Sequence, residues 1–510
     1  MLALANVPGR NTFLGSTLSI FLFPLPKRAP SSFFPLTFFM QSLPRKPLPA
    51  RPAFLVMLGP GIIWMALAQG SGELIWWPYI VAKYGLAFLF LLIPACIIQF
   101  PLTFEIGRYT ILTGEGIFRG FFRLNKWYGG ALWLLFTVSF LWFGAFATAG
   151  GTAIARLTNF PTDWQPRSQT LFWAQASIIF FTVAILYAKT AYRLIEWVMK
   201  IVASISIVGM AVACSHPSVR SHLGEFLQGL IWPDFNEMQK FQAADAEQLL
   251  TAITFAGLGG FWTLFYSYWI KEKGAGMASY MVPMTGFRGH RVSLHGGAGT
   301  LPAQDAESTS RLKSWYRYLA LETWIGILGN LATTLMTCLL AFVLLHPEKQ
   351  LPEQFEIAVV QSQFFAVSWG DAGRLLFLFI AGAFLADTWL ATVDCVSRIH
   401  LDALESIWPE FSKQDQRTWY YGIVLALAGV TSVTMYLEPP GTLILLSAVI
   451  GIFGTVSYSL GLIFLNHVVL RRQLAPAQKS SRWSMALLIF VALCYLALAI
   501  GYLIVKFIHF

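Results

Sequence analysis

Charged residues are scarce in this sequence. They make up 12% of the 510 residues, about half of their share in a typical soluble domain. Hydrophobic residues make up 56% and the mean hydropathy is +0.61, and repeated apolar runs are long enough to cross a bilayer. This composition excludes a set of soluble domains and predicts an integral, multi-pass membrane protein.

The net charge of +10 does not indicate a nucleic-acid-binding protein, because no basic folded module is visible. The basic residues instead lie in short loops between apolar runs. There they set the topology and meet the anionic headgroups of membrane lipids. Membrane lipids are therefore expected as partners, and nucleic acids are not.

Several chemical motifs are also missing. The five cysteines show no Cys-x-x-Cys spacing, which argues against a disulfide framework or a thiolate zinc site. No phosphate-binding Gly-x-x-x-x-Gly-Lys-Ser/Thr loop, His-Glu-x-x-His zinc motif or Gly-x-Ser-x-Gly nucleophile turn occurs. We therefore expect neither ATP hydrolysis nor another enzymatic activity, and no cofactor.

The apolar runs predict an all-α protein with about 11 transmembrane helices. Basic loops at 107–130, 271–318 and 467–483 alternate with acid-rich ones at 215–248 and 346–373. Since Lys and Arg favour the cytoplasmic side, we expect a cytoplasmic N-terminus and an external C-terminus in the cell membrane. The predicted spans are 54–81, 86–106, 131–155, 171–188, 194–214, 249–270, 319–345, 374–396, 419–437, 442–466 and 484–507.

These spans suggest a division of the chain. Residues 1–52 hold nine prolines and an apolar run too short to span, and we expect a disordered, basic cytoplasmic extension, with Met40 as an alternative start to Met1. Helices one to five would occupy 53–214, and an external loop 215–248. Helices six to ten would occupy 249–466, with the cytoplasmic loop 271–318 inside that range. A loop and helix eleven would form 467–510.

Two of the spans are interrupted by glycine clusters at mid-length. One breaks at Gly70-Ser71-Gly72-Glu73 and the other at Gly257-Leu258-Gly259-Gly260. Hydrocarbon tolerates irregular backbone only where it is buried in protein or lines a cavity. A pair of broken spans, one opening each half of the membrane region, predicts the central binding site of a transporter.

Short segments between residues 54 and 470 resemble the Nramp family of divalent-metal transporters. They are Gly59-Pro60-Gly61, Gln99 through Gly107 to Thr113-Gly114-Glu115, Arg193-Leu194-Ile195-Glu196, and Arg317-Tyr318 with Glu322. Their order and spacing are those of the family. The resemblance implies a LeuT-like fold, in which helices one to five and six to ten form inverted repeats and helices one and six are broken.

The chain departs from the family at its metal motifs. The Asp-Pro-Gly-Asn motif falls on Gly70-Ser71-Gly72-Glu73, so the aspartate is missing and Glu73 replaces the asparagine. The Ala-x-x-Met-Pro-His motif falls on 256–261, where Ala256 is kept, Gly259 replaces the methionine and Phe261 the histidine. We expect Glu73 to be the metal ligand, helped by Gly70, Ser71, Ala256, Gly257 and Gly259. The alternative role for Glu73 is to cap the second half-helix.

Weaker candidates are polar residues in later spans. Asp387 and Asp394 share a helix face with Thr388 nearby, and Ser457 could supply a hydroxyl. For Asp394 the alternative is an ion pair with Arg398, four residues on. We likewise expect Glu105 to pair with Arg108, and Glu322 with Arg317 or Arg193.

Losing the thioether removes a preference for soft metals, and a single carboxylate with neutral oxygens suits hard cations such as Mg²⁺ or Ca²⁺. The extra glycines are expected to enlarge the cavity. We therefore predict a secondary transporter or facilitator of a divalent metal cation, working by alternating access. Because Gly70 and Phe261 do not titrate, little proton flux is expected. An organic solute such as an amino acid is the alternative substrate, and an intramembrane enzyme is a weaker alternative.

Overall fold

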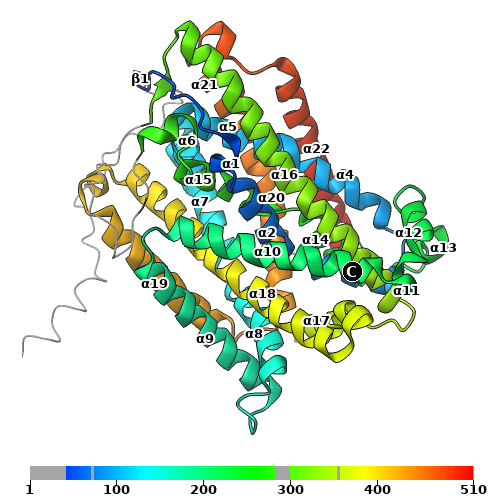
Figure 1. Ribbon diagram of the computed structural model, residues 1–510. Helices are drawn as coiled ribbons and strands as arrows, with labels where there is room; N and C mark the ends of the chain where they lie inside the picture. Colours follow the sequence, from blue (N-terminus) through cyan, green and yellow to red (C-terminus); the bar gives the residue numbers. More distant parts are fainter. Residues whose placement is uncertain (1–41, 71–73, 282–283, 285–298, 353–355, 509–510) are drawn as a thin grey trace, which may run out of the picture. The chain divides into compact units, whose positions relative to one another are not determined.

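The apolar runs fold into a bundle of helices. The computed structural model describes residues 42–70, 74–281, 284, 299–352 and 356–508, and Figure 1 traces them. The main helices of the bundle are α2 (Pro60–Ala68), α3 (Trp76–Tyr84), α4 (Leu92–Ile97), α5 (Gln99–Thr113), α7 (Lys126–Ser139), α8 (Gly144–Thr158), α9 (Pro166–Tyr187), α10 (Ala191–Ser215), α14 (Ala246–Thr254), α15 (Phe265–Glu272), α16 (Ala306–Leu344), α18 (Gln363–Ile407), α19 (Gln416–Thr434), α20 (Pro440–Ile463) and α22 (Arg482–Ile508).

Shorter elements connect these helices. They are β1 (Arg45–Lys46), α1 (Phe54–Met57), η2 (Leu89–Leu91), α6 (Ile117–Leu124), α11 (Pro217–Arg220), α12 (Leu223–Gly229), α13 (Phe235–Met238), η3 (Ala243–Asp245), η4 (Gly260–Leu264), η5 (Gly276–Tyr280), β2 (Leu301–Pro302), α17 (Ile357–Gln361), η6 (Pro409–Lys413), η7 (Phe464–Val469), α21 (Leu470–Gln473) and η8 (Pro476–Gln478). The two strands pair in parallel, Arg45 with Leu301 and Lys46 with Pro302.

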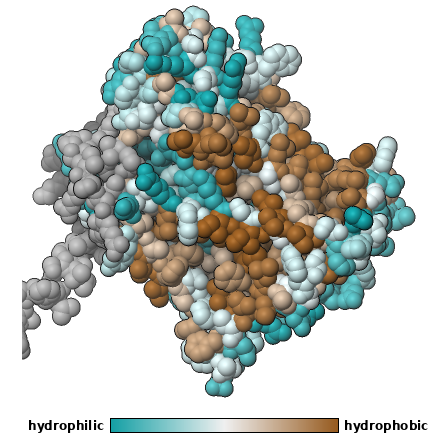
Figure 2. All heavy atoms as spheres, in the orientation of Figure 1, coloured by the Kyte–Doolittle hydropathy of each residue, from teal (hydrophilic) through white to brown (hydrophobic). Residues whose placement is uncertain are grey.

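The helices have the properties of membrane spans. Within the described ranges, eight continuous helical segments are long and apolar enough to cross a bilayer. Large apolar side chains are exposed on outer helices, and Figure 2 shows hydrophobic residues gathered over the middle of one face. Examples are Ile179 and Phe180 on α9, Val208 on α10, and Phe490 and Leu493 on α22. The protein is therefore a multi-pass membrane protein, as its composition predicts.

Both predicted interruptions are present. The first span stops as an α-helix at Ala68 and resumes at Trp76, so that α2 and α3 are two halves. The second stops at Thr254 and resumes at Gly260, where η4 leads into α15. The backbone has positive φ angles at Gly259 (62°) and Gly260 (49°), a conformation that residues other than glycine rarely adopt. These breaks confirm the expectation from the glycine clusters.

The connections gather at two ends of the bundle, as the alternation of charge predicts. At one end, loops distant in sequence touch: the amide of Gly299 donates to Glu115 Oε1 (2.8 Å), and Gln478 Nε2 donates to the carbonyl of Ala303 (2.8 Å). At the other end, Lys349 Nζ donates to the carbonyl of Lys83 (2.9 Å). We call these ends the basic-loop end and the acidic-loop end. Which of them faces the cytoplasm stays a prediction.

Part of the expected N-terminal extension belongs to the basic-loop end. Leu48 is fully buried, its amide donates to Ser308 Oγ (3.1 Å), and Arg45 Nη1 donates to the carbonyl of Pro302 (3.2 Å). The sequence predicts disorder over residues 1–52, but residues 42–52 pack against this end of the bundle, so the prediction is wrong for them. Residues 1–41 lie outside the described part of the chain.

The long helix α18 crosses the bundle and packs against α8 and the broken helices. It bends at Gly370, whose φ is 58°, and then runs without interruption to Ile407. Small residues let α8 approach it closely: a Cβ atom on Gly150 would lie 2.9 Å from the amide nitrogen of Ala386. Close approach through small residues is how helices associate in membranes. It fixes which side of α18 faces α8 and which faces the broken helices.

Candidate functional site

The first helix break lies directly against α18. A Cβ atom on Gly70 would lie 2.2 Å from Thr388 Oγ1 and 3.1 Å from the carbonyl oxygen of Phe384. Thr388 Oγ1 in turn donates to that carbonyl (2.9 Å). Ser71 and Glu73 fall outside the described residues, so their assignment to the site stays a prediction.

The second break is equally tight. A Cβ atom on Gly259 would lie 2.3 Å from the carbonyl oxygen of Thr254, and one on Gly260 would lie 3.1 Å from the Cα atom of Gly451 in α20. Ala256, between the two half-helices, is fully buried. The backbone of this break thus packs against itself and α20. A methionine at position 259 could not be accommodated without moving the backbone.

Gln99 of α5 also reaches the second break. Its Nε2 donates to the carbonyl of Thr254 (3.3 Å), and a Cβ atom on Gly257 would lie 2.5 Å from its Oε1. The ring of Trp64, from α2, lies 2.7 Å from the same Cβ position. Gly257 is therefore the point where the two broken helices meet, as expected for two halves of one central site.

Aromatic rings fill the space beside the second break. Trp262 packs on Phe140, Phe146 and Phe255, with ring centroids 4.5, 5.8 and 5.5 Å away. Its Nε1 donates to Thr392 Oγ1 of α18 (3.3 Å). The expectation that the glycines enlarge the cavity is therefore wrong. Neighbouring rings and backbone occupy the volume that the missing side chains would leave, and the glycines instead allow close approach.

Phe261, at the family's histidine position, is part of this aromatic packing. Its ring lies 5.6 Å from that of Phe136 and 6.1 Å from that of Tyr458. Tyr458 OH donates to the carbonyl of Gly260 (3.0 Å), so Tyr458 reaches the break from α20. Its neighbour Ser457 is half-buried and offers its carbonyl to Tyr128 OH (2.9 Å). Of the hydroxyl residues that the sequence offers in this span, Tyr458 contacts the break.

The two acids predicted on α18 differ in their surroundings. Asp394 accepts hydrogen bonds from Arg398 Nε (3.0 and 2.9 Å) and from Tyr420 OH. This confirms the alternative interpretation of Asp394 as an ion-pair partner. Asp387 is fully buried, and neither carboxylate oxygen has a hydrogen-bond partner among the described residues.

Glu322 caps a half-helix. Its carboxylate accepts from the amides of Gly59 (3.2 Å) and Gly61 (2.6 Å), at the N-terminal end of α2. The expected pairing of Glu322 with Arg317 or Arg193 is wrong. A carboxylate there satisfies amides that have no partner inside the helix and complements the positive end of its dipole.

Ion pairs close the bundle around the same end of α2. Glu196 Oε1 pairs with Lys200 (2.7 Å) and Lys273 (2.8 Å), and both lysines also donate to the carbonyl of Leu58 (3.2 Å each). These contacts connect α10, the end of α15 and the segment before α2. The half-helix α2 is thereby held at the basic-loop end.

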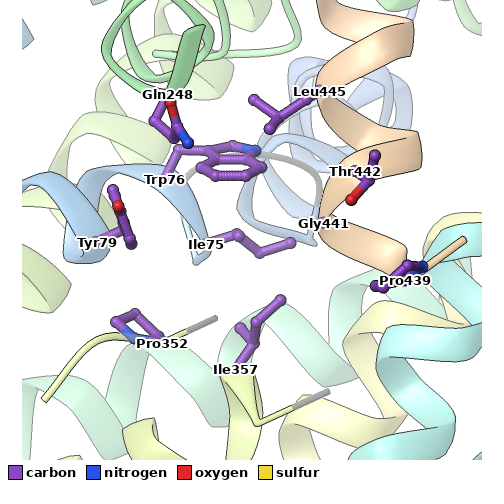
Figure 3. A pocket seen from close by; sticks show the side chains of 10 residues that line it. All are labelled: Ile75, Trp76, Tyr79, Gln248, Pro352, Ile357, Pro439, Gly441, Thr442 and Leu445. Carbon is purple, nitrogen blue, oxygen red and sulfur yellow. The ribbon is translucent and has the colours of Figure 1, made fainter. Parts of the chain in front are cut away.

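A cavity of about 170 Å³ lies at the acidic-loop end, where α3 begins. Figure 3 shows Ile75 and Trp76 projecting toward it, with Gln248 of α14, Ile357 of α17 and Thr442 of α20 around it. The cavity starts two residues beyond the undescribed stretch 71–73. Ion pairs therefore connect the helices at the basic-loop end, and a cavity lies beside the broken first span at the acidic-loop end.

No family model matches this sequence, and no curated protein matches it either. Solved structures of similar fold exist. Two are crystal structures of mutants of a manganese transporter from Eremococcus coleocola, each 12% identical. Each alignment covers 91% of this chain and 98% of the transporter, with TM-scores of 0.52 and 0.53. This chain has the Nramp-type fold.

The likeness to these structures confirms the fold class: an all-α, multi-pass bundle with broken first and sixth spans. At this identity the likeness shows the fold alone. Both of these similar structures are those of a transporter.

Proposed function

We propose that this protein is a secondary transporter that moves a small divalent metal cation by alternating access. The observation that carries the proposal is the pair of half-helices meeting at Gly257 within an Nramp-type fold. Half-helix ends and unwound carbonyls are the usual ligands of ions in such folds. Structures of similar fold include those of a manganese transporter, which supports a metal cation in particular.

The packing around the breaks favours an ion over an organic solute. Cβ atoms at Gly70, Gly257 and Gly259 would each come within 2.5 Å of a neighbouring atom, and rings of Trp262 and Phe140 pack beside them. These contacts leave no room for larger side chains at the breaks, which favours a small ion as the substrate over an organic solute.

The donor set favours a hard cation. Among the described residues, no group of three His, Cys, Asp or Glu side chains is arranged to hold a metal. The site would then consist of carbonyl and hydroxyl oxygens with Glu73 as the charged ligand. Such oxygen sites suit Mg²⁺, Ca²⁺ or Mn²⁺ better than soft Cd²⁺.

The orientation belongs to the same proposal. We place the basic-loop end, with the ion pairs of Lys200 and Lys273, in the cytoplasm, because Lys and Arg favour that side. The N-terminus is then cytoplasmic, the C-terminus external, and the cavity beside Trp76 opens outward. Reporter fusions at residues 125 and 230 test this, since only the first should report a cytoplasmic location.

Uptake by the purified protein in liposomes tests the function. We expect saturable uptake of Mg²⁺, Ca²⁺ or Mn²⁺, with Cd²⁺ no stronger as a competitor, and no uptake of amino acids above protein-free liposomes. Amino-acid uptake that needs no metal would contradict the proposed substrate. A strong preference for Cd²⁺ would contradict the argument from ligand hardness.

A further inference from the structure

A second cavity lies on the outer side of the bundle, between α8, α9 and α18. It is lined by residues within 154–158, 173–181 and 379–386, and its volume is about 600 Å³. Ligand pockets in proteins typically measure about 300–1,000 Å³. We call this cavity the lateral groove. None of its lining residues belongs to the two helix breaks or to the cavity beside Trp76.

The lining of the lateral groove is apolar. Three of its side chains carry a polar group, and each already donates its hydrogen to a backbone carbonyl. Thr158 Oγ1 donates to Ile154, and Ser177 Oγ donates to Trp173 (2.8 Å each). Trp173 Nε1 donates to Phe160 (2.8 Å). Ordered water and polar solutes need several free polar partners, so this lining favours an apolar occupant.

The groove opens toward the membrane lipids. Phe180 of α9 and Phe379 of α18 line it and are 66% and 60% exposed, and Ile179 beside Phe180 is exposed as well. These side chains belong to the apolar outer surface of the membrane spans. The groove is therefore continuous with the surface that contacts the bilayer, and a lipid can enter it from the side.

Aromatic side chains mark one end of the groove. The rings of Trp173 and Phe160 lie 6.4 Å apart, and Phe172 lies 5.4 Å from Trp173 and 5.9 Å from Trp164. Tryptophans of this kind are typical of the membrane–water interface. From Trp173 to Phe181, α9 rises by about 12 Å. One leaflet of hydrocarbon is about 15 Å thick, so the groove has the length of an acyl chain of one leaflet.

The charges at this end suit a phospholipid. Arg156 lies in the last turn of α8 and Arg167 in the first turn of α9, and both are exposed. Asp163 is in the loop between them, so two arginines against one aspartate leave one positive charge. Basic residues at the membrane surface attract anionic headgroups. A sterol has no anionic group to place there.

The inner wall of the groove is the contact between α8 and α18. Gly382 and Ala386 line the groove, and a Cβ atom on Gly382 would lie 2.8 Å from Ile154 Cγ1. Ala386 also packs on Gly150. These small residues bring the helices together but leave a hollow beside them. An empty hollow loses dispersion contacts on one side, and an acyl chain would restore them.

We propose that the lateral groove binds one acyl chain of a phospholipid, whose phosphate lies at the loop between α8 and α9. The bound chain completes the packing beside the contact of α8 with α18, the helix that also packs against the first break. This lipid is held at a defined place, unlike the lipids that exchange freely along α22. The site does not depend on which substrate the protein moves.

Photo-crosslinking of the full chain in liposomes tests the site. The probe is a phosphatidylglycerol that carries a diazirine in one acyl chain, and the labelled peptides are identified by mass spectrometry. Labelling within 173–181 and 379–386 should exceed labelling within 487–497 of α22 about fourfold, the preference expected for burying one further CH₂ group. Unlabelled phosphatidylglycerol should compete for the groove, whereas cholesterol should not.

Filling the groove provides the matched comparison. Ala176 and Ala383 are half-buried in its lining, so Ala176→Leu combined with Ala383→Leu should reduce the labelling of the groove to the level of α22. Ala497→Leu, at an exposed alanine on α22, should leave the labelling intact.

A second measurement uses the unfolding midpoint of delipidated protein in detergent. Adding phosphatidylglycerol should raise the midpoint of the parent and of Ala497→Leu by about 3 °C. The variant with the filled groove should lose this rise. Neither measurement needs a transported substrate, so both stay informative if cation transport is not found.

Three results would overturn the site. One is equal labelling of the groove and α22 in the parent protein. Another is unchanged labelling after the groove is filled. The third is displacement of the probe by cholesterol but not by phosphatidylglycerol, which would assign the groove to a sterol. If the double variant does not yield folded protein, Ala176→Leu alone decides.

Discussion

The buried acids on α18 and its neighbours differ in whether they have a partner of opposite charge. At the basic-loop end, Asp394 and Glu272 share the guanidinium of Arg398, and the side chains of all three are at most 6% exposed. About two helical turns away on α18, Asp387 has no partner of this kind among the described residues. The first group has its counter-charge built in and stabilises one arrangement of helices. Asp387 has no such counter-charge among the described residues.

The largest expected effect comes from breaking the paired group. Arg398→Met leaves two buried carboxylates without their cation and should lower the free energy of unfolding by about 3–5 kcal/mol. The matched control is Arg374→Met, whose partner Asp371 is exposed on the same helix, with an expected loss of about 0–1 kcal/mol. The unfolding midpoints in detergent provide the measurement. Equal losses in the two variants would mean that the Arg398 cluster is not a structural element.

The next effect concerns the contact between the first break and α18. Gly70→Ala places a methyl group 2.2 Å from Thr388 Oγ1, and such overpacking should destabilise the protein by about 1–3 kcal/mol and strongly reduce uptake. Thr388→Ala in the same chain should restore part of both losses, because it removes the nearest clashing atom.

Gly130→Ala on α7 is the matched control for Gly70→Ala, because a Cβ atom there meets nothing within 4 Å. Unfolding midpoints and liposome uptake report both effects. If Gly70→Ala and Gly130→Ala behave alike, Gly70 does not pack on α18 during transport.

A smaller effect is expected from a paired acid at the acidic-loop end. Asp245 accepts hydrogen bonds from Lys83 Nζ (2.9 Å), Tyr79 OH (2.9 Å) and Tyr84 OH. Burial alone would raise the pKa of Asp245, but the hydrogen bonds from Lys83, Tyr84 and Tyr79 outweigh it and lower the pKa below the ordinary value.

Because the pKa of Asp245 is lower in the folded state, its stabilising contribution is present above the unfolded pKa of about 3.9 and is lost as the pH falls through the folded pKa. Asp245→Asn should therefore cost about 1–3 kcal/mol at pH 7 and progressively less below pH 4. Unfolding midpoints measured from pH 7 to pH 3 give the result. A loss that does not change with pH would show that the charge of Asp245 is not what stabilises this end.

The sequence predicts the features of this protein that depend on local pattern. Long apolar runs indicate the helices, and glycine clusters indicate both breaks. The pairs Glu105–Arg108 and Asp394–Arg398 follow from spacings of three and four residues on a helix. Each of these depends on residues that are near one another in the chain.

The errors concern contacts between distant segments. Glu322 binds the amides of Gly59 and Gly61, more than 260 residues away, instead of an arginine. The side chain of Thr388 fills the space beside Gly70, and a contact between residues so far apart in the chain cannot be predicted from local sequence. Asp387 is recognisable in the sequence as a polar residue in a span, but only the structure shows that it alone among these acids has no partner in the described chain.

The smallest expected effect is a null result on proton movement. Gly70 and Phe261 stand where the resemblance implies titrating residues, and Phe261 is packed among aromatic rings. Uptake of the metal should therefore cause little acidification of a pH dye trapped in the liposomes when the membrane potential is clamped. Strong, metal-dependent acidification would reveal a proton route and would contradict this expectation.

Divalent-cation uptake by Glu73→Gln tests the central claim most directly. The substitution keeps the volume and one carbonyl oxygen but removes the charge that we assign to the transported ion. We predict that uptake in liposomes falls at least tenfold while the unfolding midpoint stays close to that of the parent. Glu225→Gln, an exposed acid on α12, should transport normally. Near-normal uptake by Glu73→Gln would contradict the account and leave Glu73 as a cap of the second half-helix.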